Sequence, residues 1–216
     1  MADRALPFAA FEAYMRADDA PAHPMTALFE ATYSGRLDRD RLGRALSLTL
    51  REHPLLRATI DRAARRPRWR ISEDATPHFC YAEDDVPLRF PGDAEFIDLR
   101  RETGLRVWVR QGQAGGRIVF QFHHACTDGV GVTHFVLDVL RAYAFLSGVE
   151  AVAPPSREEA LLRSRDRFFR YPLFNRLRLL ASAARRTRGW HRSKPIPLSG
   201  AASGPSAQDR PMEAVR

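Results

Sequence analysis

Two adjacent histidines, His123 and His124, stand at the end of an apolar run, and Asp128 follows four positions after the second. A neutral imidazole can take up a proton near neutral pH, so a histidine here is a candidate general base. Neighbouring strand residues point their side chains to opposite faces, so the two rings cannot easily share one metal ion. The pair therefore predicts acid–base chemistry and no metal site.

Alternation along the strand distinguishes the two histidines. His124 continues the apolar face formed by every second residue from 118 to 122, so its ring is expected to point into the interior, at its edge. His123 shares the other face with Gln121, where a half-buried, hydrogen-bonded structural histidine is the simplest interpretation. We therefore expect His124 to be the chemically active member of the pair.

The residues after the histidines have capping or catalytic interpretations. Asp128 precedes a helical pattern, where an aspartate commonly caps the helix, and it is also close enough to order the loop that holds His124. Gly129 and Gly131 permit a tight turn. The two residues before Asp128 are interpreted as packing or capping residues: Cys126 and Thr127.

The elements that position this motif follow from hydrophobic periodicity. The clearest prediction is a hairpin of two alternating strands around the turn 112–116, with the histidines at its far end. A helix follows, with a core face of Val132, Phe135, Val136, Val139, Leu140 and Tyr143, and Gly148 at its stop. Upstream, we predict a strand at 27–33, a helix between Asp38 and His53, β-like residues at 55–60, and irregular chain at 72–95.

Composition allows one core of ordinary size or two small ones, and the excess charge lies in one segment. The 216 residues are 44% hydrophobic with two cysteines, which suggests neither a disulfide framework nor a zinc cage. The net charge is +8, but residues 157–194 alone carry +9, so the rest of the chain sums to −1. No uninterrupted apolar run of membrane-spanning length and no signal-peptide pattern is present, so we expect a cytoplasmic protein.

The segment "HHACTDG", residues 123–129, resembles the HHxxxDG motif of the chloramphenicol acetyltransferase-like acyltransferase superfamily. That superfamily includes nonribosomal-peptide condensation domains, polyketide-associated acyltransferases, and wax ester synthase/diacylglycerol acyltransferases, whose motif spelling is the most similar. The resemblance extends over residues 7–148, through "HPLLRA" at 53–58 and the hairpin. It implies an α/β fold, namely one lobe with a mixed β-sheet and flanking helices.

The resemblance also implies roles, residue by residue. His124 matches the catalytic histidine that removes a proton from an acceptor hydroxyl, amine or thiol as it attacks an acyl thioester. Asp128 matches the aspartate that shapes the loop, and its family partner is an arginine that Arg57 matches, which predicts an ion pair. Gly129 matches the glycine that lets the pantetheine arm or the acceptor approach. No cofactor is bound permanently, and the co-substrate is acyl-coenzyme A or an acyl-pantetheine carrier protein.

Length is where the chain departs from the family, whose fold has two similar lobes. We expect 1–150 to be the first lobe, 151–194 a basic helical crossover segment, and 195–216 a disordered linker or tail. The second lobe would then be needed in cis or in trans, and the chain alone would be inactive with apolar surface exposed. The alternative is a non-catalytic half-domain that acts as a binding or regulatory module.

The basic segment has three interpretations. The first is a helix between 173 and 188 that packs its apolar stripe on the missing lobe. The second is an interfacial helix on an anionic membrane surface, which would make the protein peripheral to the membrane. Nucleic-acid binding ranks last, because no known nucleic-acid-binding module accompanies the arginines.

Overall fold

The computed structural model describes residues 4–61, 67–83, 86–89 and 96–149, together with residues 153, 162 and 165. All of them belong to one compact unit, Met1–Phe169. The predictions for the tail 195–216 and for the helix between 173 and 188 lie outside the described residues. So does the rest of the basic segment, apart from the three single residues.

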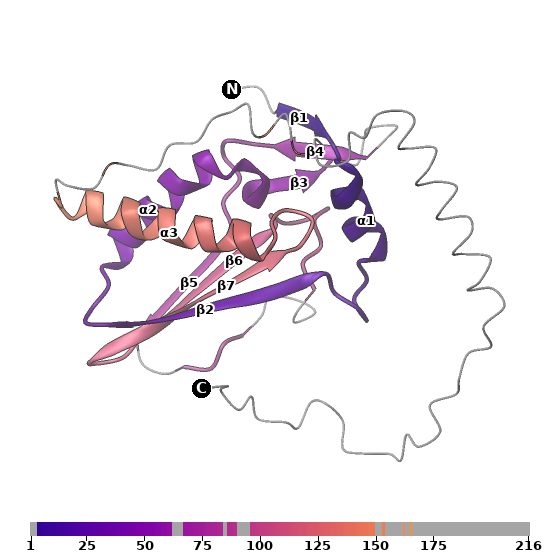
Figure 1. Ribbon diagram of the computed structural model, residues 1–216. Coiled ribbons are helices and arrows are strands. Elements are labelled where there is room, and N and C mark those ends of the chain that lie inside the picture. The colour runs from indigo at the N-terminus through magenta and orange to yellow at the C-terminus, as the bar shows by residue number, and fades with distance from the viewer. Residues whose placement is uncertain are drawn as a thin grey trace, which may run out of the picture. The chain divides into compact units, whose positions relative to one another are not determined.

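Two β-sheets form the framework (Figure 1). The smaller sheet is antiparallel with the order β1-β4-β3, from Arg4–Pro7, Arg68–Ile71 and Ala58–Ile60. The larger sheet has the order β2-β7-β6-β5, from Thr26–Ser34, Gly115–His123, Leu105–Gln111 and His78–Glu83. Since β5 pairs parallel to β6 and the other pairs are antiparallel, the larger sheet is mixed.

Two long helices, α2 (Arg39–Glu52) and α3 (Gly129–Leu146), lie side by side over one face of the larger sheet (Figure 1). Two shorter elements complete the lobe: α1 (Ala10–Asp18) and the 3₁₀ helix η1 (Pro54–Arg57). The predicted fold class, a mixed sheet with flanking helices, is confirmed. Asp38 caps α2 by accepting a hydrogen bond from the Arg41 amide, as the sequence predicts.

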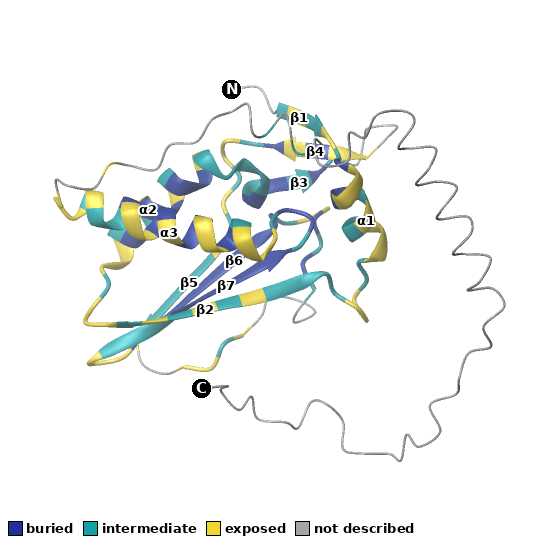
Figure 2. Ribbon diagram, in the orientation of Figure 1, coloured by how far each residue is buried: buried dark blue, intermediate teal, exposed yellow. Residues whose placement is uncertain are grey.

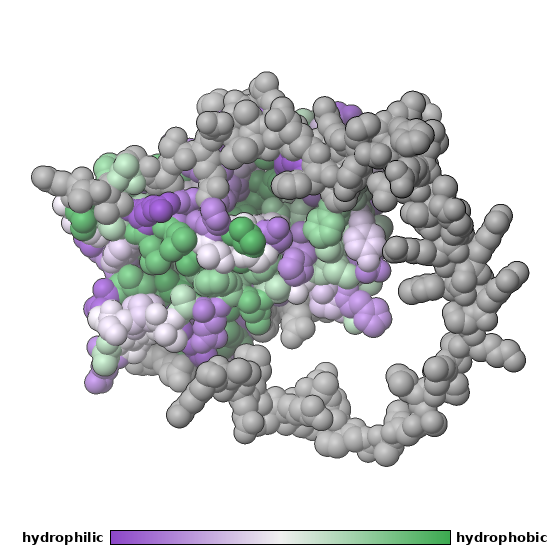
Figure 3. All heavy atoms as spheres, in the orientation of Figure 1, coloured by the Kyte–Doolittle hydropathy of each residue, from purple (hydrophilic) through white to green (hydrophobic). Residues whose placement is uncertain are grey.

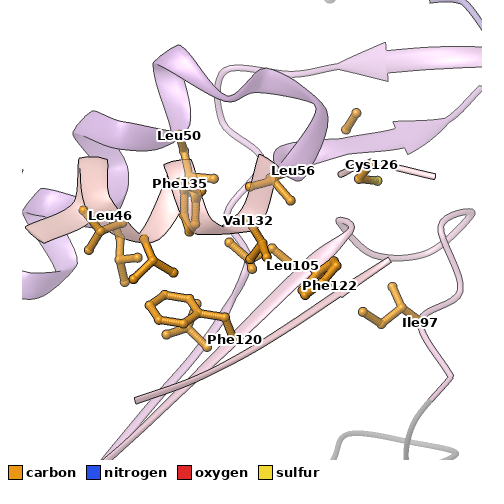
Figure 4. Packing of buried hydrophobic residues seen from close by; sticks show 14 of the residues in the cluster. Leu46, Leu50, Leu56, Ile97, Leu105, Phe120, Phe122, Cys126, Val132 and Phe135 are labelled. Carbon is orange, nitrogen blue, oxygen red and sulfur yellow. The ribbon is translucent and has the colours of Figure 1, made fainter. Parts of the chain in front are cut away.

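The core lies between this face of the sheet and the two helices (Figures 2 and 4). Phe120 of β7 meets Phe135 of α3 edge-on, with ring centroids 5.9 Å apart. His53 at the end of α2 packs against the same Phe135 and pairs with Asp138 of α3 at 2.8 Å. The two helices are therefore joined by a polar contact at the middle of α3, and the Phe120–Phe135 contact holds α3 against β7.

The opposite face of β6 and β7 is also buried, and it carries polar residues beside Trp108 and Val119. Arg106 of β6 is 2% exposed, and its guanidinium donates to both Glu102 oxygens, at 2.8 and 2.6 Å, and to the Gln121 side chain at 3.1 Å. Buried charge is tolerated only when it is paired and hydrogen-bonded in this way. The strand end that carries His123 is therefore enclosed on both faces.

Three predictions about the elements and the core differ from the structure, and two elements were not predicted. Residues 54–57 form a 3₁₀ turn because Pro54 starts it and the Leu56 amide donates to the His53 carbonyl, so strand structure begins only at Ala58. The segment expected to be irregular contains β5, which forms by pairing with β6. The sequence analysis did not predict β1 and α1. Leu140, expected in the core, is 49% exposed.

Helix α3 has 18 residues with a mean hydropathy of 1.3, so it could span a membrane by length and composition. Its packing against the sheet and α2 is instead that of a core helix, since Val132, Phe135, Val136 and Val139 belong to the core. Its outward side carries exposed apolar residues, and Figure 3 shows apolar atoms gathered over this helix. Those residues are Val130, Leu137, Leu140 and Phe145.

Helix α1 is anchored at its start by the buried carboxylate of Glu12. This carboxylate accepts hydrogen bonds from the Ala9 amide and from the indole of Trp69 in β4, both at 2.8 Å. It also pairs with Arg165, one of the described residues of the basic segment, at 2.5 Å. The first turn of α1 is held against the small sheet. Asp19, the residue after the last turn of α1, therefore lies next to the end of β7.

Candidate functional site

The histidine pair lies where β7 ends and the chain turns into α3. Strands on both sides hold its backbone: the His123 amide donates to the Gly104 carbonyl at 3.0 Å, and the His124 amide donates to the Met25 carbonyl at 2.8 Å. The His123 carbonyl then accepts from the Cys126 amide at 2.8 Å, which closes a tight turn. Both imidazoles are therefore mounted on a rigid strand end.

His123 is fully buried, and its two ring nitrogens face the Ala125 amide and the Asp19 carboxylate. Its Nδ1 accepts a hydrogen bond from the Ala125 amide at 3.0 Å. Its Nε2 lies 3.1 Å from the Asp19 carboxylate, within ion-pair distance but away from the direction of a good hydrogen bond. Since Nδ1 accepts, the ring proton is on Nε2, facing Asp19. His123 was predicted to be half-buried, and its exposure of 0% reflects the covered second face of the sheet.

Asp19, which the sequence analysis did not predict, touches both sides of the motif. One carboxylate oxygen lies next to the His123 ring, and the other accepts from the Met25 amide at 2.8 Å. The carbonyl of Met25 in turn accepts from the His124 amide. A single, mostly buried carboxylate therefore connects the ring of the first histidine to the backbone that positions the second.

His124 is half-buried, so part of the residue is exposed to solvent, unlike His123. The ring packs edge-on against Phe122, with centroids 5.4 Å apart and planes at 78°. This contact places it on the core-facing side of the strand, as the alternation predicts. A half-buried histidine that is held on one side is suited to proton transfer with a bound molecule.

Asp128 caps α3, which is one of the two roles that its position suggests. Its carboxylate accepts from the Gly131 amide at 2.7 Å, and its own carbonyl accepts from the Val132 amide at 2.9 Å. A Cβ at position 131 would lie 2.2 Å from the Thr127 hydroxyl, so this position favours glycine. A Cβ at Gly129 would meet nothing within 4 Å, so there is open space at the position expected to admit a substrate.

The predicted ion pair between Arg57 and Asp128 is wrong. The Asp128 carboxylate is exposed and turned to the first turn of α3, where the free amides attract it. The Arg57 guanidinium instead donates to the Glu73 carbonyl, at 3.4 Å. No ion pair joins the two side chains in the described part of the chain, so the loop is ordered by the helix cap and by Asp19.

Cys126 is a packing residue, as the sequence suggests. Its side chain is buried beside Gly104, where a Cβ would lie 2.2 Å from the sulfur. Burial raises the pKa of its thiol far above the usual value, which removes the thiolate needed for nucleophilic attack. The described residues contain no group of three or more His, Cys, Asp or Glu side chains that could hold a metal ion.

Comparison with known proteins places this geometry in context. No family model matches the chain. The uncharacterized protein Rv2305 of Mycobacterium tuberculosis (strain ATCC 25618 / H37Rv) is 36% identical over 137 residues, which are 61% of this chain and 31% of that protein. Its counterpart MT2362 in strain CDC 1551 / Oshkosh gives the same values. The chain therefore spans about a third of the length of these curated relatives.

Solved structures show the fold. The starter condensation domain of rhizomide synthetase matches with a TM-score of 0.60 at 17% identity, over 78% of this chain and 45% of that one. The epimerization domain from the third module of tyrocidine synthetase B gives 0.59 at 14%, over 74% and 39%. The condensation domain of the monacolin K polyketide synthase gives 0.55 at 14%, over 76% and 39%.

The fold is that of the condensation domains. At these identities the similarity concerns architecture, and each match covers less than half of the solved chain. The reported matches do not confirm the closer resemblance to wax ester synthases, which stays a prediction.

We predict that Asp19→Ala lowers the free energy of unfolding by about 1–3 kcal/mol, because it leaves the Met25 amide without its acceptor and removes the carboxylate that lies next to the buried His123 ring. Chemical denaturation of the full chain followed by circular dichroism measures this. The exposed neighbour Asp18 supplies the control, and Asp18→Ala should change stability by less than about 0.5 kcal/mol. Equal, small effects of both substitutions would show that Asp19 does not hold the motif.

The capping role of Asp128 predicts a smaller effect. Asp128→Ala should cost about 1 kcal/mol, and Asp128→Ser should recover most of it, because serine also accepts from the amides of a helix start. A buried ion pair with Arg57 would instead cost about 3–5 kcal/mol on removal of one partner, and serine would not restore it. The same denaturation experiment distinguishes the two results.

Proposed function

We propose that this chain supplies one lobe of an acyltransferase, in which His124 is the general base. The observation that carries the proposal is the asymmetry of the histidine pair: His123 is fully buried and its two ring nitrogens face Asp19 and a backbone amide, whereas His124 is half-buried. The condensation-domain fold supports it, because proteins of that name join an acyl group to an acceptor. Coenzyme A or a carrier protein would present the acyl group as a thioester.

In the proposed reaction, an imidazole nitrogen of His124 takes the proton of an acceptor hydroxyl or amine. The acceptor oxygen or nitrogen then forms a bond to the thioester carbonyl carbon. The carbon–sulfur bond breaks, and the departing thiolate receives the proton from the imidazolium. The acyl group passes directly to the acceptor, without an acyl-enzyme, in keeping with the raised pKa of the buried Cys126 thiol.

The proposed site needs a second wall. His124 lies at the edge of the described lobe, and an acyl thioester held against one surface only would lack the positioning that makes the transfer effectively unimolecular. The matched structures and the M. tuberculosis relatives are two to three times as long as the part this chain covers. We therefore propose that activity requires a second lobe in cis or in trans.

The non-catalytic alternative, a half-domain that binds a partner, predicts no turnover in any combination. The exposed apolar side of α3 is the feature that favours an interaction role. Dependence of turnover on His124 separates the two proposals, because a binding module would retain its fold and its partner when this half-buried ring is removed.

We predict that His124→Ala lowers turnover by about 10²–10⁴-fold while the protein stays folded. The assay is thiol release from a panel of acyl-coenzyme A donors with alcohol and amine acceptors. It uses the full chain, alone and combined with the remaining part of the M. tuberculosis relative. His134→Ala on the exposed side of α3 is the matched control and should leave turnover unchanged.

Two outcomes would contradict the proposal. If turnover survives His124→Ala, His124 is not the general base. If the chain alone shows robust turnover, a second lobe is not required. His123→Ala should act mainly by lowering stability, since its ring is fully buried.

A further inference from the structure

A cavity of about 500 Å³ lies between α2 and the strands β5 and β6, apart from the histidine motif. Its inner wall is apolar and comes from Leu46 and Leu50 of α2 and from Leu105 and Val107 of β6, all of them buried. Figure 4 shows Leu46, Leu50 and Leu105 among the core side chains. Phe79 of β5 completes this end. A space of this size and lining is typical of small-molecule sites in proteins.

The other end of the cavity opens to solvent. Four of its lining residues are exposed, and they surround this opening on α2 and on the segment between β4 and β5: Ser47, Arg51, Glu73 and Thr76. The cavity therefore passes from a polar mouth into an apolar interior, so that an amphipathic molecule could enter with its chain first.

Arg57 also lines the cavity, and its guanidinium is poorly satisfied. The Nε–H is buried and has no hydrogen-bond partner, and the bond from Nη1 to the Glu73 carbonyl is long, at 3.4 Å. Arg57 as a whole is partly exposed, but a buried N–H without an acceptor is still costly, since its lost hydration is not replaced. The described residues around the Nε–H of Arg57 provide no acceptor for it, so a bound ligand could supply one.

Charge and geometry define that acceptor. Arg51 and Arg57 outweigh the carboxylate of Glu73, so the charged lining has a net charge of +1. A guanidinium presents two parallel N–H groups that match the two oxygens of a carboxylate. The apolar end is lined by aliphatic and aromatic side chains, so it suits a hydrocarbon chain.

We propose that this cavity binds a linear aliphatic carboxylate, with the carboxylate on Arg57 and the alkyl chain between α2 and β6. The inference is independent of acyl transfer, because none of the lining residues belongs to the histidine motif. It gives Arg57 a ligand-binding role in place of the ion pair with Asp128.

Isothermal titration calorimetry of the full chain with hexanoate, octanoate and decanoate, below their micelle concentrations, tests the proposal. Burial of each methylene should raise affinity by about fourfold until the chain outgrows the cavity. Arg57→Gln should weaken decanoate binding by at least about tenfold and leave decanol binding unchanged, because only the acid engages the charge. Arg44→Gln, an exposed arginine of α2 outside the lining, is the control and should have no effect.

A second variant locates the ligand. A Cβ at Gly43 of α2 would point at Phe79 at 3.8 Å, so Gly43→Leu fills the cavity without backbone strain and improves helix propensity. It should abolish binding of both decanoate and decanol while the melting temperature holds or rises. The proposal is overturned if the unaltered chain binds no decanoate, if Arg57→Gln weakens acid and alcohol equally, or if Gly43→Leu leaves binding intact.

Discussion

The carboxylate of Asp19 is the contact on which the arrangement of the motif depends. It lies against the ring of His123 and accepts from the Met25 amide, whose carbonyl holds the backbone of His124. A carboxylate buried to this extent is retained only where hydrogen bonds and partner groups replace water. It couples α1, the start of β2 and the end of β7 at one point, so the position of His124 is set by three elements rather than by the motif loop alone.

The difference in burial between the two histidines follows from their positions on the sheet. Neighbouring side chains on β7 point to opposite faces, and both faces are buried here. One face lies under α2 and α3, and the other carries buried polar residues such as Arg106 and Gln121. The ring on the polar face is enclosed and becomes a structural member. The ring on the helical face emerges at the edge of the core, against Phe122, where the residue stays half-buried. The same strand thus supplies, from consecutive residues, a buried structural ring and the half-buried ring that we propose as the base.

Sequence patterns predicted what short-range periodicity controls. Strand alternation placed His124 beside Phe122, and helix caps at Asp38 and Asp128 were visible because capping depends on residues three positions away. Asp19 could not be predicted, because an aspartate in a polar turn resembles any solvated loop residue until α1 brings it to β7. The strand β5 forms only through non-local pairing with β6. The orientation of the Arg57 side chain could not be predicted either, because the cavity beside α2 that it lines is formed by non-local contacts.

The protonation pattern of His123 tests this account most directly. Nitrogen-15 NMR of the histidine rings in the full chain, assigned with His123→Gln, reports which ring nitrogen carries hydrogen. The Ala125 amide donates to Nδ1, so His123 must carry its proton on Nε2, directed at Asp19. In Asp19→Ala the tautomer should persist, and the Nε2 resonance should shift because the neighbouring carboxylate is gone. A His123 ring protonated on Nδ1 would be incompatible with the Ala125 hydrogen bond. It would contradict the claim that Asp19 and His123 together position His124.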